Sequence, residues 1–243
     1  SVLQIATTSA LINGSGSKLY FSDAGGEYIS GDGTDLTITS GNDIVLAMGS
    51  GGDVYSVGAD GNTGNTIFGK SAFNTSTNNA SDYNTMVGED AGGTGTVAGA
   101  LNNVAVGYKA LEDLTSADYN TALGTQAMAN LTSGQENVAI GQGSLGTATT
   151  EAFNVSIGSG AMASVRNDAS DSNVAIGKES FTGGTGAVVG NIVIGECAMN
   201  STAGNAQTGT IAIGQSALTA LTSGQKNVAI GYQALTANTQ GDN

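Results

Sequence analysis

Two pairs of adjacent carboxylates are the first candidates for chemistry in this sequence. Two acidic residues can hydrolyse a glycosidic bond when one donates a proton and the other acts as base or nucleophile. Neighbouring residues in a strand or turn point apart, however, and the two tyrosines at matching positions of the sequence, Tyr108 and Tyr232, provide no sugar platform. We therefore interpret the pairs as solvated loop charges: Glu89 with Asp90, and Glu112 with Asp113.

Oxygen ligands in glycine-rich turns suggest a second kind of site, for calcium, within the first 64 residues. Asp32, Asp35, Asp60 and Asn62 offer such ligands. The nonapeptide GGxGxDxUx of calcium-binding toxin repeats is not matched, and we favour simple turn chemistry. The single cysteine, Cys197, can form no disulfide within the chain and is expected to be a small buried thiol.

The sequence contains no histidine, and this excludes several classes of site. Ser-His-Asp and Cys-His catalysis both need an imidazole. Zinc sites of the usual kind need histidines or several cysteines. We expect no enzymatic activity, no metal and no cofactor.

Any site must be positioned by a phrase that is repeated ten times in residues 65–243. Two of its copies read NVAIGQGSL at 137–145 and NVAIGYQAL at 227–235. The glycines of successive copies are 17 to 19 residues apart, and the variation falls in polar connectors such as LTSGQ, where a repeat can absorb an insertion. This period is typical of a solenoid and too short for a pair of helices.

Each position of the phrase predicts a structural role. Val138 and Ile140 alternate with Ala139, which predicts a strand with Val and Ile on the core side. The following glycine predicts a sharp corner. A small and then a bulky apolar residue, after two variable ones, predict a second short strand. We therefore expect an all-β, parallel β-solenoid of about ten coils of 17–19 residues.

Equivalent positions of stacked coils would form ladders at the ~4.8 Å spacing of paired strands. Stacked asparagines would hydrogen-bond as an amide ladder, with a ligand-binding row as the alternative. The expected amide ladder is Asn84, Asn103, Asn120, Asn137, Asn154, Asn173, Asn191 and Asn227. The expected apolar ladder is Ile140, Ile157, Ile176, Ile194, Ile213 and Ile230. The corner glycines are Gly69, Gly88, Gly107, Gly124, Gly141, Gly158, Gly177, Gly195, Gly214 and Gly231.

The small residue between Val and Ile would face away from that core. A row of alanines suits the close approach of another surface better than it suits solvent, and a thin coil has little interior of its own. We therefore predict a homotrimer around a common axis, with a monomeric rod as the alternative. The row consists of Ala105, Ala122, Ala139, Ala175, Ala212 and Ala229.

Two other solenoid functions find little support in the repeat. The segment IGQGSL at 140–145 matches the hexapeptide of left-handed β-helix acyltransferases, but the match occurs once per coil rather than three times, and no histidine is present. An ice-binding face would need a sustained threonine array. Threonine occupies the first strand position in only three repeats, at Thr66, Thr85 and Thr121.

Residues 1–64 lack the phrase and carry short β-like runs between Gly and Asp turns, for example at 18–22 and 35–40. They predict a small β-rich N-terminal unit before the repeat array at 65–243. No signal-peptide pattern and no methionine open the chain, so we expect a fragment or a processed product.

The charge balance bears on the partners. Six Lys and Arg stand against twenty Asp and Glu, a net charge of −14, which would repel a phosphate backbone and an anionic membrane. No stretch approaches the ~20 apolar residues that span a bilayer. We expect no nucleic-acid partner and no membrane insertion.

The phrase NVAIGxxAL, with its flanking Asn and Gly, resembles the repeat of phage tail-fibre and tail-spike shafts, particularly those of marine phages. It is also similar to the head repeat of YadA-like trimeric autotransporter adhesins. The resemblance covers all ten repeats in 65–243, and the stretch 18–47 resembles the segment that precedes such repeats in phage fibres.

The resemblance implies a trimeric, left-handed parallel β-roll in an appendage carried by a virion. Because the coils are longer than those of adhesin heads, the phage shaft is favoured over a bacterial cell-surface adhesin, and a self-assembling extracellular filament is a third hypothesis. The implied partners are further copies of the chain, other virion tail proteins, and a host-surface glycan or receptor.

Overall fold

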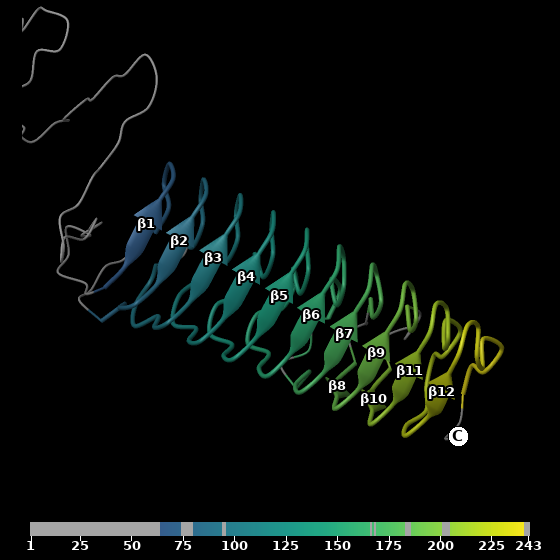
Figure 1. Ribbon diagram of the computed structural model, residues 1–243. Helices are drawn as coiled ribbons and strands as arrows, with labels where there is room; N and C mark the ends of the chain where they lie inside the picture. Colours follow the sequence, from purple (N-terminus) through teal and green to yellow (C-terminus); the bar gives the residue numbers. More distant parts are fainter. Residues whose placement is uncertain are drawn as a thin grey trace, which may run out of the picture. The chain divides into compact units, whose positions relative to one another are not determined.

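The computed structural model describes residues 64–73, 80–93, 96–165, 167, 169–182, 186–200 and 205–240. These residues form an all-β, parallel solenoid in which each coil contributes one short strand to a common sheet (Figure 1). The predicted fold class is thereby confirmed. The predicted N-terminal unit at 1–64 lies, except for Gly64, outside the described residues, as do the calcium candidates Asp32, Asp35, Asp60 and Asn62.

The main sheet of the described residues has ten strands, which lie side by side in the order of the chain, and two further strands form a separate sheet. The strands are β1 (Thr66–Phe68), β2 (Thr85–Val87), β3 (Val104–Val106), β4 (Thr121–Leu123), β5 (Val138–Ile140), β6 (Val155–Ile157), β7 (Val174–Ile176), β9 (Ile192–Ile194), β11 (Ile211–Ile213) and β12 (Val228–Ile230). Two further strands, β8 (Val188–Val189) and β10 (Gln207–Thr208), pair with each other in parallel.

Neighbouring strands are parallel and in register, so that equivalent residues of successive coils face each other. Ala122 of β4 pairs with Ala139 of β5, for example, and Leu123 pairs with Ile140. Coils of different lengths keep this register because the additional residues lie in the connectors. The register is what brings one residue type per position into a continuous row.

The segment after the corner glycine is a turn and not the second strand that the sequence predicted. In the coil of β3, Lys109 and Leu111 both have left-handed backbones, with φ of 57° and 52°. A strand would send Ala110 and Leu111 to opposite sides, whereas this turn buries both side chains completely. The turn still joins the coils, since the N–H of Leu111 donates to the carbonyl of Ala127 at 3.0 Å.

The interior is filled by the middle residue of each strand, which is small in most coils, and by the apolar pair of each turn, such as Ala110 and Leu111. Ala105, Ala139 and Ala175 have no exposed surface, while Ile140 is 37% exposed and Ile230 67%. The predicted orientation of the strands was therefore wrong: alanine faces inward, and valine and isoleucine face outward. A thin coil explains this, because the bulky turn residue, such as Leu111, leaves room only for a small side chain opposite it.

No helix of the described residues is long and apolar enough to cross a membrane.

Candidate interaction surfaces

The asparagine side chains stack in a continuous amide ladder inside the solenoid. Asn137 is representative: its Nδ2 donates to Oδ1 of Asn120 at 3.0 Å and to the carbonyl of Glu151 at 2.8 Å. Its own Oδ1 accepts from the backbone N–H and the Nδ2 of Asn154, at 3.0 and 3.2 Å. Both the oxygen and the nitrogen of this amide thus form hydrogen bonds between coils. A buried side chain with all its polar groups hydrogen-bonded has a structural role and offers no group to a ligand.

The same pattern joins the asparagines from Asn65 to Asn191, all of which are buried. Thr210 then occupies the next position. Its backbone N–H still donates to Oδ1 of Asn191 at 2.9 Å. Its hydroxyl is buried and has no hydrogen-bond partner among the described residues, and both polar side-chain atoms of the nearby Gln207 are in the same condition. The ladder is therefore weakest at this coil.

The corner glycines stack directly on one another. A Cβ built on Gly177 would lie 2.7 Å from the carbonyl carbon of Gly195, and its φ of 127° is a conformation that side chains rarely adopt. A Cβ on Gly231, in the coil of β12, would meet no atom within 4 Å, although its φ is 126°. The corner row is thus required by the close approach of the next coil as well as by the backbone angle.

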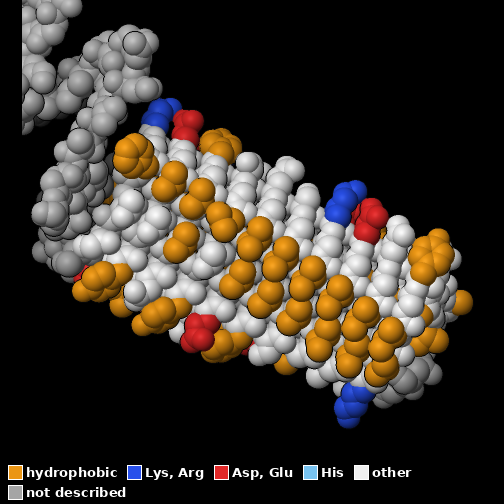
Figure 2. Space-filling model, in the orientation of Figure 1, with side chains coloured by type: hydrophobic (Ala, Val, Ile, Leu, Met, Phe, Trp, Pro, Cys, Tyr) orange, Lys and Arg blue, Asp and Glu red, His pale blue; other side chains and the backbone are white. Residues whose placement is uncertain are grey.

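The outer face of the main sheet is largely apolar. Figure 2 shows hydrophobic side chains in two parallel rows that cross the strands. They belong to the first and third residues of the strands of the main sheet, and Thr66, Thr85 and Thr121 interrupt the first row. The hydrophobic residues include Ile140 and Val228, exposed by 37% and 53%. None of the twelve described strands contains Asp, Glu, Lys or Arg. An uncharged face on a chain with a net charge of −14 is unlike an ordinary solvated surface.

Two of the four carboxylates singled out in the sequence form ion pairs with lysines. Glu89 pairs with Lys70 of the previous coil at 2.9 Å, and this hydrogen bond raises the pKa of Lys70 above its ordinary value. Glu112 pairs with Lys109 at 2.6 Å within its own turn. Glu89 and Glu112, one from each candidate pair, are thus each held by a lysine. Among the described residues no group of three His, Cys, Asp or Glu could hold a metal ion.

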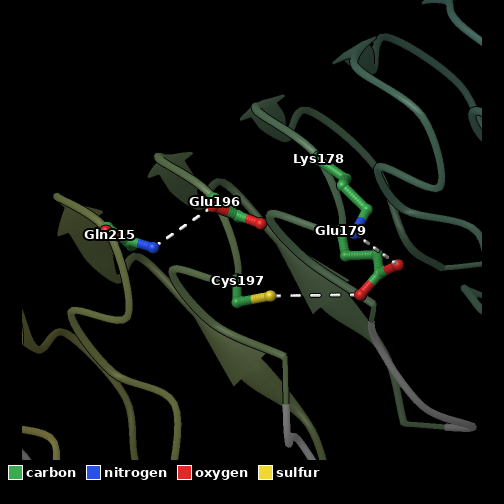
Figure 3. A network of polar contacts seen from close by, with 5 residues as sticks. All are labelled: Lys178, Glu179, Glu196, Cys197 and Gln215. Carbon is green, nitrogen blue, oxygen red and sulfur yellow. Dashed lines mark hydrogen bonds and ion pairs between the residues drawn. The ribbon is translucent and has the colours of Figure 1, made fainter.

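The single cysteine belongs to a chain of polar contacts on the turns that follow the corner glycines (Figure 3). Cys197 Sγ lies 3.9 Å from Oε2 of Glu179, and Glu179 lies 3.7 Å from Lys178. In the adjacent coils, Gln215 donates to Glu196 at 3.2 Å. The thiol is half-buried rather than fully buried as the sequence suggested.

A row of large side chains follows the edge at which the strands begin, and sequence reasoning missed it. The residue directly before each ladder asparagine is exposed, and in three coils it is aromatic: Tyr83 (59% exposed), Tyr119 (56%) and Phe153 (48%). Figure 2 shows large hydrophobic side chains, with an acidic one between them, along this edge. The fixed position relative to the asparagine was the available signal, but tyrosines were compared only at the position after the corner glycine.

No family model, no curated protein and no solved structure significantly matches this chain.

Proposed function

We propose that this chain is a non-catalytic shaft segment of a phage tail fibre, assembled as a homotrimer through the outer face of its sheet. The observation that supports this most is the outer face of the sheet. It consists of Val and Ile with a few Thr, Phe and Leu, and it continues without a charged residue over all ten strands of the main sheet. The nine spacings of ~4.8 Å between ten strands and three residues of ~3.3 Å each give this face roughly 430 Å², a size typical of the largest apolar patch of a monomeric protein, which is often functional.

A second copy of the chain is the partner that fits this face best. Two parallel copies would present equivalent rows at every coil, because each copy has the same in-register spacing. Association elsewhere on the surface would bring like charges together, since acidic residues outnumber basic ones twenty to six. Three copies around an axis parallel to the coil stack would bury the same face on each, and the number three follows the resemblance of the repeat to trimeric shafts.

A shaft needs length and rigidity rather than a reactive centre. Coils that contact only their neighbours can extend such an object without changing its cross-section. In the proposed role the chain holds a receptor-binding element away from the particle, and its further partners are other virion tail proteins and a host-surface receptor or glycan.

Light scattering of the intact protein during size-exclusion chromatography tests the assembly. The proposal expects three times the 23.8 kDa of the chain, and a monomer mass would overturn it. Gold-labelled antibodies against the chain then test its location in a culture of the source organism and its phages. Label on tail fibres supports the shaft, label on the bacterial envelope supports the adhesin, and label on free filaments supports the third hypothesis.

A further inference from the structure

The residue before each ladder asparagine adopts the same left-handed backbone in every coil in which it is described. Gly64, Gly190 and Gly209 have φ of 69°, 65° and 66° at this position. Glycine takes such a conformation without strain, whereas a side chain raises the free energy of the folded state. Seven described coils nevertheless have a side chain there. Ser172 and Lys226 are two of these residues, with φ of 62° and 57°. The other five belong to the successive coils of β2 to β6 and are Tyr83, Asn102, Tyr119, Glu136 and Phe153, with φ between 55° and 61°.

These five side chains form one row, because the backbone holds them in equivalent places. The N–H of Tyr119 donates to the carbonyl of Leu101 at 2.9 Å, and the N–H of Phe153 donates to the carbonyl of Gln135 at 3.0 Å. In both cases the acceptor is the residue directly before the row member of the previous coil, Asn102 or Glu136. Aromatic and polar residues alternate along the row. Successive aromatic rings are therefore two coils apart, roughly 10 Å at the ordinary strand spacing.

The row also contains a depression. Tyr119, Glu136 and Val138 line a shallow open pocket between two coils. At the start of the row the ring of Tyr83 leans over Gly64, since a Cβ built on Gly64 would lie 2.7 Å from Cδ1 of the ring. The three aromatic side chains, each about half exposed, thus alternate with an amide and a carboxylate that can donate or accept hydrogen bonds.

We propose that this row binds an extended, neutral, β-1,4-linked glycan. A spacing of roughly 10 Å, twice that of paired strands, is close to the length of two pyranose rings in such a chain, where alternate rings present the same face to one side. Tyr83, Tyr119 and Phe153 stack on every second ring. Asn102 and Glu136 bind the hydroxyl groups of the rings between. The net charge of −14 and the carboxylate of Glu136 select against acidic polysaccharides.

This inference makes the host-surface glycan of the proposed function specific, and it rests on that function only for its biological setting. The binding itself depends on the row alone. Since the chain has seven tyrosines and no tryptophan, tyrosine fluorescence and calorimetry can both follow a sugar titration. The probes are cellohexaose and chitohexaose, with an oligogalacturonate and an α-1,6-linked isomaltohexaose as comparison sugars.

The decisive comparison is between Tyr119→Ala, Phe153→Ala and the control Tyr232→Ala, which removes an exposed tyrosine from the position after a corner glycine. We expect saturable binding of at least one neutral β-1,4 hexasaccharide, weakened about tenfold by either row variant and unchanged by the control. Circular dichroism checks that each variant is folded.

Three outcomes would overturn the proposal: no binding of either β-1,4 hexasaccharide, equal binding by the row variants and the wild type, or tighter binding of the acidic or α-linked sugar. A lower molecular mass of Tyr119→Ala without sugar binding by the wild type would assign the row to contacts between copies. Sugar binding by a protein of monomer mass would keep the row and reject the trimeric shaft, so the two proposals fail separately.

Discussion

Met86 is large at a position where most coils have a small residue, and Gly92 is small at a position where the other coils have a bulky one. Met86 is the fully buried middle residue of β2, where most coils have alanine. Gly92 occupies the turn position that is Leu, Met or Phe elsewhere. A Cβ built on Gly92 would lie 2.7 Å from Sδ of Met86. The two positions therefore face each other across the interior and share one volume.

This relationship predicts a compensating double substitution. Met86→Ala alone should cost about 3 kcal/mol by leaving a cavity, and Gly92→Leu alone should cost about 2 kcal/mol by overpacking. The double variant restores the arrangement of the other coils, and its free energy of unfolding should lie within about 1 kcal/mol of that of the wild type. Urea denaturation measures all three, and simple additivity of the two single effects would contradict the shared volume.

The amide ladder predicts a large effect for Asn137→Ala. The substitution leaves the N–H of Asn154 and the carbonyl of Glu151 buried without their partners, which should cost about 3 kcal/mol. Asn130→Ala is the matched control, because Asn130 is exposed in a connector, and it should change the free energy of unfolding by less than about 0.5 kcal/mol. Similar melting temperatures for the two variants would show that the amide ladder does not stabilise the fold.

The interruption at Thr210 predicts a stabilising substitution. Thr210→Asn supplies an Oδ1 and an Nδ2 where a buried hydroxyl now has no partner among the described residues. It should raise the free energy of unfolding by about 1 kcal/mol. The reverse change at an intact site, Asn173→Thr, should lower it. Differential scanning calorimetry distinguishes the two signs, and a lower melting temperature for Thr210→Asn would contradict the expectation.

The corner row predicts unequal costs for two glycine-to-alanine substitutions with the same backbone angle. Gly177→Ala and Gly231→Ala share the strain of a φ near 127°, which costs on the order of 1–3 kcal/mol. Only Gly177→Ala also drives a methyl group into the backbone of Gly195, so it should lose more stability or fail to fold. Thermal unfolding followed by circular dichroism compares them, and equal losses would show that the angle alone fixes the glycine.

The orientation of the strands predicts different consequences for substitutions to aspartate at two neighbouring positions. Ile176→Asp places a charge on the half-buried outer face, where we expect the coil to remain folded and the assembly to dissociate. Ala175→Asp places the charge at a site with no exposed surface, where we expect unfolding because the carboxylate would be buried without a partner. Light scattering and circular dichroism together separate these results. An unchanged mass for Ile176→Asp would argue against this face as the contact between copies.

The repeat phrase alone was enough to predict the fold. A period of 17–19 residues and a strand-like phrase followed by glycine allow few architectures other than a β-solenoid. The amides and corner glycines could be assigned in advance because their chemistry permits few roles. A row of asparagines can saturate itself between coils, and glycine tolerates angles that other residues avoid.

The direction of the strands could not be predicted, because the alternation of Val, Ala and Ile is satisfied with either face inward. Hydrophobicity favoured valine and isoleucine as the core. The space inside each coil decides the orientation instead, because the middle residue of the strand and the bulky residue of the turn share it. The large Met86 in the same coil as the small Gly92 was the sequence feature that indicated this.

The left-handed residues were also beyond the sequence. Lys109, Leu111 and Tyr119 have positive φ although none is a glycine, and no propensity favours this for leucine or tyrosine. Hydrogen bonds between coils hold these residues in place, such as that from Lys109 N–H to the carbonyl of Glu89 at 3.0 Å. Without that constraint in view, the turn resembled a strand, and the aromatic row at the edge of the sheet went unnoticed.

The in-register stacking has a mechanical consequence for a chain under tension. The coils are stacked along one direction (Figure 1). The hydrogen bonds between their paired strands run in that direction, while the covalent chain passes from each coil to the next only once. A pull from end to end is therefore carried by all the bonds of an interface together. When one interface ruptures, a single coil of about 18 residues unravels and releases about 60 Å of chain. Stretching should consequently produce a series of force peaks of similar height, with the first drop at the coil of Thr210, where the amide ladder is interrupted.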